Sequence, residues 1–131
     1  MTDDTDDTPT GETAIDAGIC ERVAAERDVD ADDLAGALDV VAADLTDEHS
    51  RFEREYDHTT VEGSRIYFVD GEEWADIGDR LDLSESTLGA VRAAHEEQAE
   101  RLLSEATTGY REKLAEGTAV VAGVDTAEEM V

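Results

Sequence analysis

Apolar residues repeat at intervals of three and four from residue 34 to residue 56, and this pattern constrains the fold more than any other in the chain. The repeating positions are Leu34, Leu38, Val41, Leu45, Phe52 and Tyr56. This spacing places them on one face of a helix, because an α-helix turns once every 3.6 residues. Asp30 or Asp32 supplies a capping side chain at its start. We therefore expect one amphipathic helix of about six or seven turns.

A shorter helix is predicted before the long one. Ile15, Ile19 and Val23 follow the same spacing from Glu12 onward, and the pattern ends near the sequence RDVD. Residues 1–11 are polar, carry four aspartates and hold the single proline, so we expect a disordered acidic tail there. A chain of 131 residues suits one modest core. Residues 12–131 are therefore predicted to form a single globular domain.

The period of the pattern changes at residues 59–69, TTVEGSRIYFV, which are rich in β-branched and aromatic side chains. Gly63 followed by Ser64 suits a two-residue hairpin turn with glycine first. The cross-strand pairs expected from this turn are Glu62 with Arg65 and Val61 with Ile66. Tyr67 and Phe68 point to opposite faces of a strand, so we expect one of them inside with Trp74 and the other toward a partner.

Two helices joined by a tight turn are predicted after the hairpin. Asp70, with Glu73 three residues later, indicates a helix start of the capping-box type, and that helix covers about residues 71–81. Ser84 caps the next helix, and Gly78 allows the two helices to approach closely. The apolar residues expected between them are Trp74, Ile77, Leu81, Leu83, Leu88 and Val91. The second helix continues through Ala99, Leu102 and Ala106 toward Tyr110 and Leu114.

Residues 74–95, WADIGDRLDLSESTLGAVRAAH, resemble the helix-turn-helix of transcription regulators and sigma factors. The shared pattern is an isoleucine followed by a small residue, then a leucine, a turn, the sequence S-x-S-T and another aliphatic residue. Asp82 departs from the pattern, because those proteins usually carry glycine in the turn. The resemblance implies a recognition element at residues 72–95, within a helix-turn-helix-like unit at residues 71–106, and makes DNA a candidate target.

In a DNA-reading unit, the exposed face of the second helix contacts base edges and phosphates. The residues expected on that face are Ser84, Glu85, Ser86, Thr87, Gly89, Ala90 and Arg92. Arg92 is the one cation among them, and the residues Glu72, Glu73, Asp76 and Asp79 of the preceding helix would face the DNA backbone unfavourably. In a cell that holds molar salt, the attraction between a protein and DNA phosphates is already weak. An acidic protein face is tolerable under such conditions, but it does not favour DNA binding.

Acidic residues outnumber basic ones 36 to 10, which gives a formal net charge of −26, yet 40% of the residues are hydrophobic. This composition indicates a folded chain with an acidic surface, which concentrated salt would screen because the Debye length falls to about 3 Å at 1 M. Lys113 is the single lysine. The composition resembles that of cytoplasmic proteins of salt-accumulating archaea, so the charge indicates the solvent more than the partner.

From Ile15 onward the chain also resembles the uncharacterised small acidic proteins of haloarchaea, notably in HSRFEREYD and AVRAAHEEQA. That resemblance implies a fold and a habitat and brings no activity with it. Cys20 is the single cysteine, which excludes an internal disulfide and a Cys-based zinc site. Neither a signal peptide nor an apolar stretch of about 20 residues is present, so we expect a cytoplasmic protein without a membrane partner.

Two histidines fall on the apolar helical stripes. His49 lies between Leu45 and Phe52, and His95 follows Val91, so the two imidazoles would meet if their helices pack together. The carboxylates available to share a metal with them are Glu48, Glu53 and Glu96. The Glu-x-x-His pairs of di-metal helical bundles are absent, so a buried, hydrogen-bonded histidine is the expected outcome and metal binding is a distant alternative.

The predicted fold class is α+β and mostly α-helical, with a small antiparallel hairpin before the helix-turn-helix-like unit. An apolar run near residues 118–122 is expected to add a third strand, because an isolated hairpin is marginal in water. No phosphate-binding glycine loop or nucleophile elbow is recognisable, so we expect neither an enzyme nor a cofactor.

The first functional hypothesis is a regulatory or adaptor protein that recognises its target, with DNA as a candidate, through the helix-turn-helix-like unit. The alternative is a helical protein-interaction or dimerisation module that binds no nucleic acid.

Overall fold

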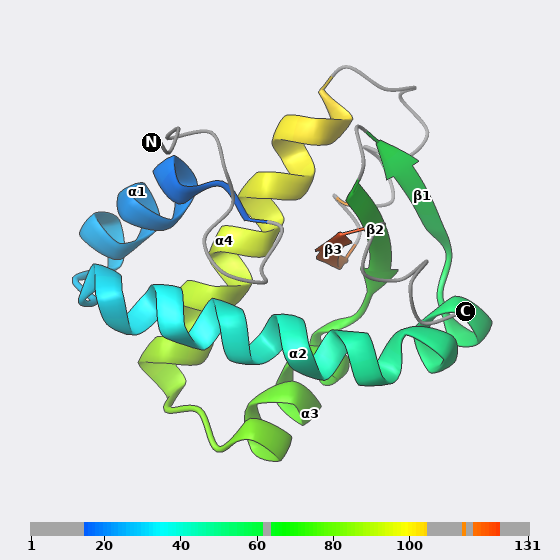
Figure 1. Ribbon diagram of the computed structural model, residues 1–131, viewed down its shortest axis with the longest axis horizontal. Coiled ribbons are helices and arrows are strands. Elements are labelled where there is room, and N and C mark those ends of the chain that lie inside the picture. Colours follow the sequence, from blue (N-terminus) through cyan, green and yellow to red (C-terminus); the bar gives the residue numbers. More distant parts are fainter. Residues whose placement is uncertain (1–14, 62–63, 105–113, 115–116, 124–131) are drawn as a thin grey trace, which may run out of the picture.

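The computed structural model describes residues 15–61, 64–104, 114 and 117–123. The elements in these ranges are α1 (Ala17–Arg27), α2 (Ala31–Glu55), β1 (His58–Val61), β2 (Ser64–Val69), α3 (Gly71–Leu81), α4 (Glu85–Leu103) and β3 (Thr118–Gly123). The predicted α+β, mostly helical class is confirmed, and so is the third strand (Figure 1). The acidic tail predicted for residues 1–11 lies outside the described residues, as do Ala106, the last residue of the predicted helix-turn-helix-like unit, and Tyr110 of the predicted last helix.

Helix α2 is the long helix that the apolar repeat predicts. The Asp30 carboxylate caps it by accepting hydrogen bonds from the N–H groups of Asp32 and Asp33, at 2.8 and 3.1 Å. In Figure 1, α2 extends from α1 at one end to the start of β1 at the other. It contacts α1, α3, α4 and β3, and its apolar stripe is buried against them. The long helix therefore forms the support on which the other elements pack.

The three strands form an antiparallel sheet in the order β1-β2-β3, so β2 is central. The observed pairs between β1 and β2 are His58 with Tyr67, Thr59 with Ile66, Thr60 with Arg65, and Val61 with Ser64. The predicted pairing of Val61 with Ile66 is therefore wrong by two residues, and Arg65 lies opposite Thr60 instead of Glu62, which is outside the described residues.

The position of Ser64 explains the error in register. Ser64 is the first residue of β2 and pairs with Val61, so it belongs to a strand and not to the predicted Gly63-Ser64 turn. Side chains alternate between the faces of a strand with a period of two. A shift of two residues keeps every side chain on its predicted face, so the apolar alternation fits both registers equally well.

Buried apolar side chains from all four helices, β2 and β3 form one core. Trp74 and Tyr67 lie inside it, and Phe68 is half-buried, so Tyr67 is the hairpin aromatic that joins Trp74 in the interior. The Tyr67 ring packs edge-to-face on Phe52, with ring centroids 5.4 Å apart. Burial, followed by the nearby Glu53 carboxylate, raises the pKa of Tyr67 to about 12.

The turn between α3 and α4 is closed by an aspartate in a conformation that favours glycine. Asp82 has φ 57° and ψ 46°, and the Leu83 N–H donates to the Gly78 carbonyl at 2.9 Å. Asp82 therefore adopts the left-handed conformation for which related turns usually use glycine. A Cβ on Gly78 would lie 2.6 Å from a Leu88 methyl carbon, which confirms the predicted close approach of the two helices.

We expect Asp82→Gly to stabilise the protein by roughly 0.5 to 1 kcal/mol, because glycine adopts this conformation without the steric cost of a Cβ. Chemical denaturation in molar KCl measures the change. Asp28→Gly provides a second instance, since Asp28 ends α1 with φ 60°. A loss of stability in both variants would show that the aspartate side chains make contacts worth more than the relief of strain.

Candidate functional site

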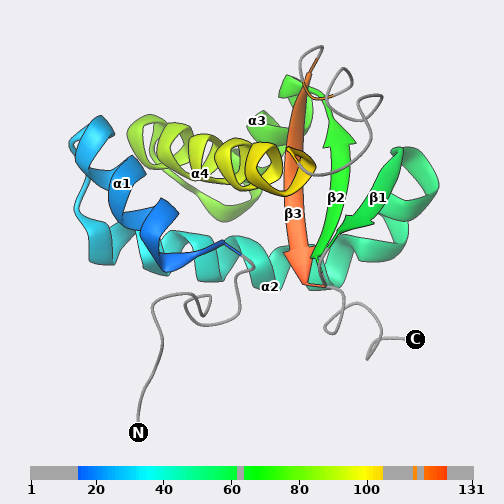
Figure 2. The same cartoon turned by 90° about the horizontal axis from the view of Figure 1, so that it is seen from above.

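The predicted recognition residues lie on the first turns of α4. Ser84, Glu85 and Ser86 are exposed, Thr87, Gly89 and Arg92 are half-buried, and Ala90 is fully buried. The Ser84 hydroxyl caps the helix by accepting from the Thr87 N–H at 3.2 Å. The placement of Ala90 on the exposed face is wrong, because α4 is covered by α1 on one side and by the sheet on another (Figure 2). The start of α4 is therefore its accessible part.

Other side chains cover Gly89 and pair with Arg92, two residues of this predicted set. Arg27 extends from the end of α1 over Gly89, where its Nη1 atom would lie 3.1 Å from an added Cβ. Arg92 donates from Nε to a carboxylate oxygen of Glu96 at 2.9 Å. The cation expected to contact phosphate is thus already engaged by a carboxylate one turn further along α4.

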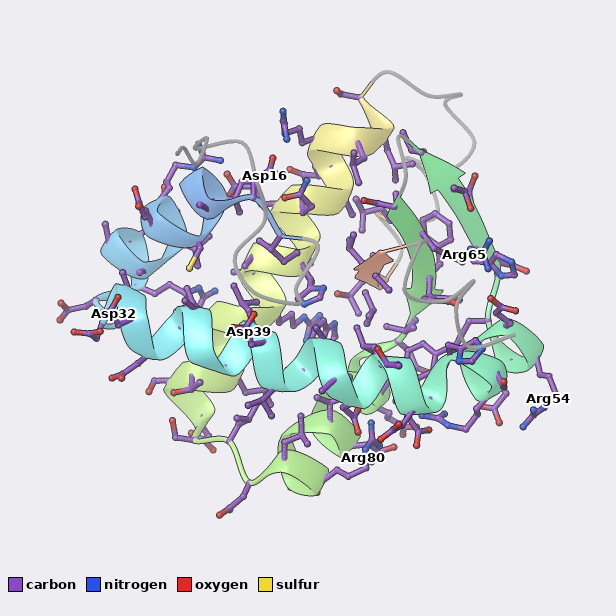
Figure 3. All side chains as sticks on the ribbon, in the orientation of Figure 1. Asp16, Asp32, Asp39, Arg54, Arg65 and Arg80 are labelled. Carbon is purple, nitrogen blue, oxygen red and sulfur yellow. The ribbon has the colours of Figure 1, made fainter. Side chains whose placement is uncertain are left out.

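Most arginines in the described ranges are held in ion pairs within the chain. The pairs are Arg22–Glu97, Arg51 with Glu48, Glu55 and Glu73, Arg65–Glu53, Arg80–Asp44, Arg92–Glu96 and Arg101–Asp16. Arg27 and Arg54 form no ion pair within those ranges. They lie near opposite ends of α2, whose 25 residues span about 37 Å, and Figure 3 shows Arg54 at the end of α2 far from α1. This part of the chain therefore presents no cluster of unpaired cations.

The outer surface of the α3–α4 hairpin is acidic. The exposed carboxylates are Glu72, Asp76 and Asp79 on α3, Asp82 in the turn and Glu85 on α4. Arg80 is directed to α2 instead, where its Nε donates to Asp44 at 3.1 Å (Figure 3). The hairpin thus offers carboxylates and hydroxyls to a partner, and its arginines are turned to the protein's own acidic residues.

Glu73 does not lie on this acidic surface, although the sequence suggested it. Its side chain is only 3% exposed and sits between α3 and α2. Arg51 donates from Nη1 and Nη2 to its two carboxylate oxygens at 3.2 and 3.0 Å, and the Tyr56 hydroxyl donates to it at 2.8 Å. Burial acts to raise the pKa of Glu73, but the hydrogen bonds from Arg51 and Tyr56 outweigh burial and lower it.

The capping box predicted from Asp70 and Glu73 is only half formed. The Asp70 carboxylate accepts from the Glu73 N–H at 3.1 Å, so the cap itself is confirmed. The Glu73 carboxylate, which would return to the start of the helix in a capping box, points to Arg51 instead. Arg51 and Glu73 are 22 positions apart in the sequence, so no local pattern identifies them as partners.

The two histidines have different surroundings. His95 is enclosed by the core, where its Nδ1 accepts from the Val121 N–H at 3.0 Å and its ring packs on Trp74 at 5.2 Å. Burial lowers the pKa of His95 to about 3, so the ring is neutral at physiological pH. His49 is half-buried on α2 and pairs through Nδ1 with the Thr46 carbonyl at 3.0 Å.

The structure does not pair the two imidazoles as the packing of their helices suggested. Within the described ranges, no three His, Cys, Asp or Glu side chains group together as metal ligands. His95 instead connects α4 to β3 and to Trp74 of α3. His95 is therefore buried as the sequence suggested and hydrogen-bonded through Nδ1, whereas its Nε2 is buried without a partner among the described residues.

These features define an acidic α+β protein in which a helical hairpin is packed on a long helix and a three-stranded sheet. The chain belongs to a family described as a domain of unknown function, DUF8048, whose model matches residues 13–124. No curated protein and no solved structure matches the chain. In the part of the chain that the structure describes, none of the helices has the length and apolar character needed to cross a membrane.

Proposed function

We propose that this chain is a non-enzymatic adaptor that recognises another protein through the α3–α4 hairpin. The observation that carries the proposal is the charge of the hairpin surface, where five exposed carboxylates stand against one unpaired cation of the described residues, Arg27 over Gly89. Such a surface attracts arginine and lysine side chains and repels phosphate. The partner surface is therefore expected to be basic.

A regulatory role on DNA is the second candidate, and the shape of the hairpin favours it. The tight turn at Asp82, the cap at Ser84 and the exposed Ser86 match the helix-turn-helix resemblance, in which the first residues of the second helix contact bases. The acidic surface makes DNA the less favourable target of the two.

Photocrosslinking tests which target the hairpin binds. A photoreactive amino acid replaces exposed Ser86 on α4 or, as a matched control, exposed Ala25 on α1. The adaptor proposal predicts a protein adduct from position 86 but not from position 25, and loss of that adduct in an Asp76→Lys/Asp79→Lys background. Because molar salt suppresses nonspecific phosphate binding, genomic DNA fragments are selected in parallel in about 1 M KCl. Recovery of one repeated DNA sequence, lost on Arg92→Ala, would replace the adaptor with the DNA regulator.

We also propose that the protein works in a salt-rich cytoplasm, because 36 acidic residues repel one another in dilute buffer. The expected result is a thermal unfolding midpoint that rises by roughly 10 °C between 0.05 and 2 M KCl, as the Debye length contracts to a few Å. Calorimetry or circular dichroism measures the midpoint. A midpoint independent of KCl would contradict the proposed adaptation to salt.

A further inference from the structure

The two edge strands of the sheet are in different surroundings. On β3, the Val121 N–H donates to His95 of α4, and Thr118 to Val121 are buried. A helix that covers an edge in this way prevents pairing with another chain. On β1, the outermost strand in Figure 1, His58 and Thr60 are exposed. The sheet is thus protected at β3 and accessible at β1.

The register shows which main-chain groups of β1 point outward. The Phe68 N–H donates to the Asp57 carbonyl at 2.9 Å, which marks residues 57 and 68 as a hydrogen-bonded pair. Bonded and non-bonded pairs alternate along antiparallel strands. Residues 59 and 61 therefore bond to β2, whereas His58 and Thr60 direct their N–H and C=O groups away from it. The same alternation directs the Val121 N–H away from β2, which agrees with its bond to His95.

Strand β1 is short, at four residues, but it lacks the residue types that usually block an exposed edge. Its sequence, HTTV, contains no proline, lysine or carboxylate. Arg65, which contacts β1, is held by Glu53 and donates from Nε to the Thr60 hydroxyl at 3.2 Å. Two donors and two acceptors of the main chain are therefore directed outward from a strand in which three of the four residues, Thr59, Thr60 and Val61, are β-branched.

We propose that β1 accepts an extended segment of a partner protein as a fourth strand, and that this segment carries basic side chains. Charge favours this partner over a second copy of the chain, which would bring a further formal charge of −26 to the edge. Glu55, three positions before β1, is paired with Arg51, but Arg51 also pairs with Glu48 and Glu73, so three carboxylates share one cation and the negative excess favours arginine or lysine in the added strand. This proposal is independent of the α3–α4 hairpin, which lies on a different side of the molecule from β1 (Figure 1). An adaptor with both sites would bind two partners through two separate surfaces.

A peptide of nine residues that alternates arginine and threonine is the probe for this edge. In 0.3 M KCl we expect it to slow the amide exchange of His58 and Thr60 in the full chain. Thr60→Pro removes an outward N–H without removing a bond to β2, so it should weaken binding at least tenfold. Thr60→Ala is the matched control, because it removes the hydroxyl and keeps the N–H, and it should bind as the wild type does.

Variants of the peptide keep the test decisive if Thr60→Pro does not fold. N-methylation of alternate peptide amides abolishes strand pairing and should weaken binding at least tenfold, and glutamate in place of arginine should do the same. Equal binding of the methylated peptide, or protection confined to α3, would overturn the proposal in favour of nonspecific attraction to acidic residues. Protection of β1 that rises with protein concentration alone would show self-pairing instead. Asp76→Lys/Asp79→Lys should leave peptide binding unchanged, which separates this edge from the hairpin.

Discussion

Arg51→Ala is expected to lower the free energy of unfolding by about 3 kcal/mol, because it leaves the Glu73 carboxylate buried without its cation. Arg54→Ala is the matched control on the same helix, since Arg54 is exposed and forms no ion pair within the described ranges. Its effect should stay within about 0.5 kcal/mol. Chemical denaturation in 2 M KCl measures both, because the high salt minimises general charge repulsion.

A double-mutant cycle separates the ion pair from the packing of the arginine. Glu73→Gln in the Arg51→Ala background removes the unpaired charge and should recover part of the lost stability. The Tyr56 hydroxyl can still donate to the glutamine oxygen in that variant. If Arg51→Ala costs no more than Arg54→Ala, the contact between α2 and α3 does not depend on this cluster.

The second large effect is expected at His95 as the pH falls. The folded protein keeps the ring neutral down to about pH 3, whereas the unfolded chain protonates it near pH 6.5. The unfolded state therefore binds the additional proton between these values, so acid weakens the folded state. In this range the contribution of His95 to the free energy of unfolding should fall by about 1.4 kcal/mol per pH unit.

Comparison of the wild type with His95→Gln isolates this contribution, because the carboxylates and the other two histidines are the same in both proteins. The wild type should be the more stable at pH 7, where the ring accepts from the Val121 N–H. Its advantage should shrink as the pH falls from 6.5 to 4.5, measured by denaturant unfolding at each pH. A constant difference would show that the folded protein protonates His95 as readily as the unfolded chain does.

The positions of the candidate recognition residues on α4 could be predicted from the sequence, whereas their accessibility could not. Ser84 to Arg92 can be located from the sequence, because a cap and an apolar repeat specify where a helix begins and which residues face inward. The availability of those residues depends on their neighbours: Arg27 covers Gly89, Glu96 engages Arg92, and α1 and the sheet bury Ala90. Local resemblance to a DNA-reading unit therefore predicted the hairpin and left its target open.

The edge of β1 was not recognised from the sequence. An edge strand and a central strand can carry the same residues, and strand order is set by which segment pairs on the other side of β2. The short apolar run after Gly117 predicted a third strand but not its position. Once β3 occupies one side of β2 and α4 covers it through His95, β1 is left at the other edge.

The sequence by itself determined that four helices and the third strand form, the starts and caps of α2, α3 and α4, and the inward faces, because these depend on residues within a few positions of one another. The start of α1 was predicted less well, since it begins at Ala17 and not near Glu12. Asp30, Asp70 and Ser84 each cap the helix that their local pattern predicts. The tertiary structure alone decided the register between β1 and β2, the pairing of Arg51 with Glu73 and the surroundings of His95. Alternation with a period of two permits more than one register, and any of 36 carboxylates could have engaged a given arginine. Such choices depend on distances between elements, which are fixed only when all the elements pack together.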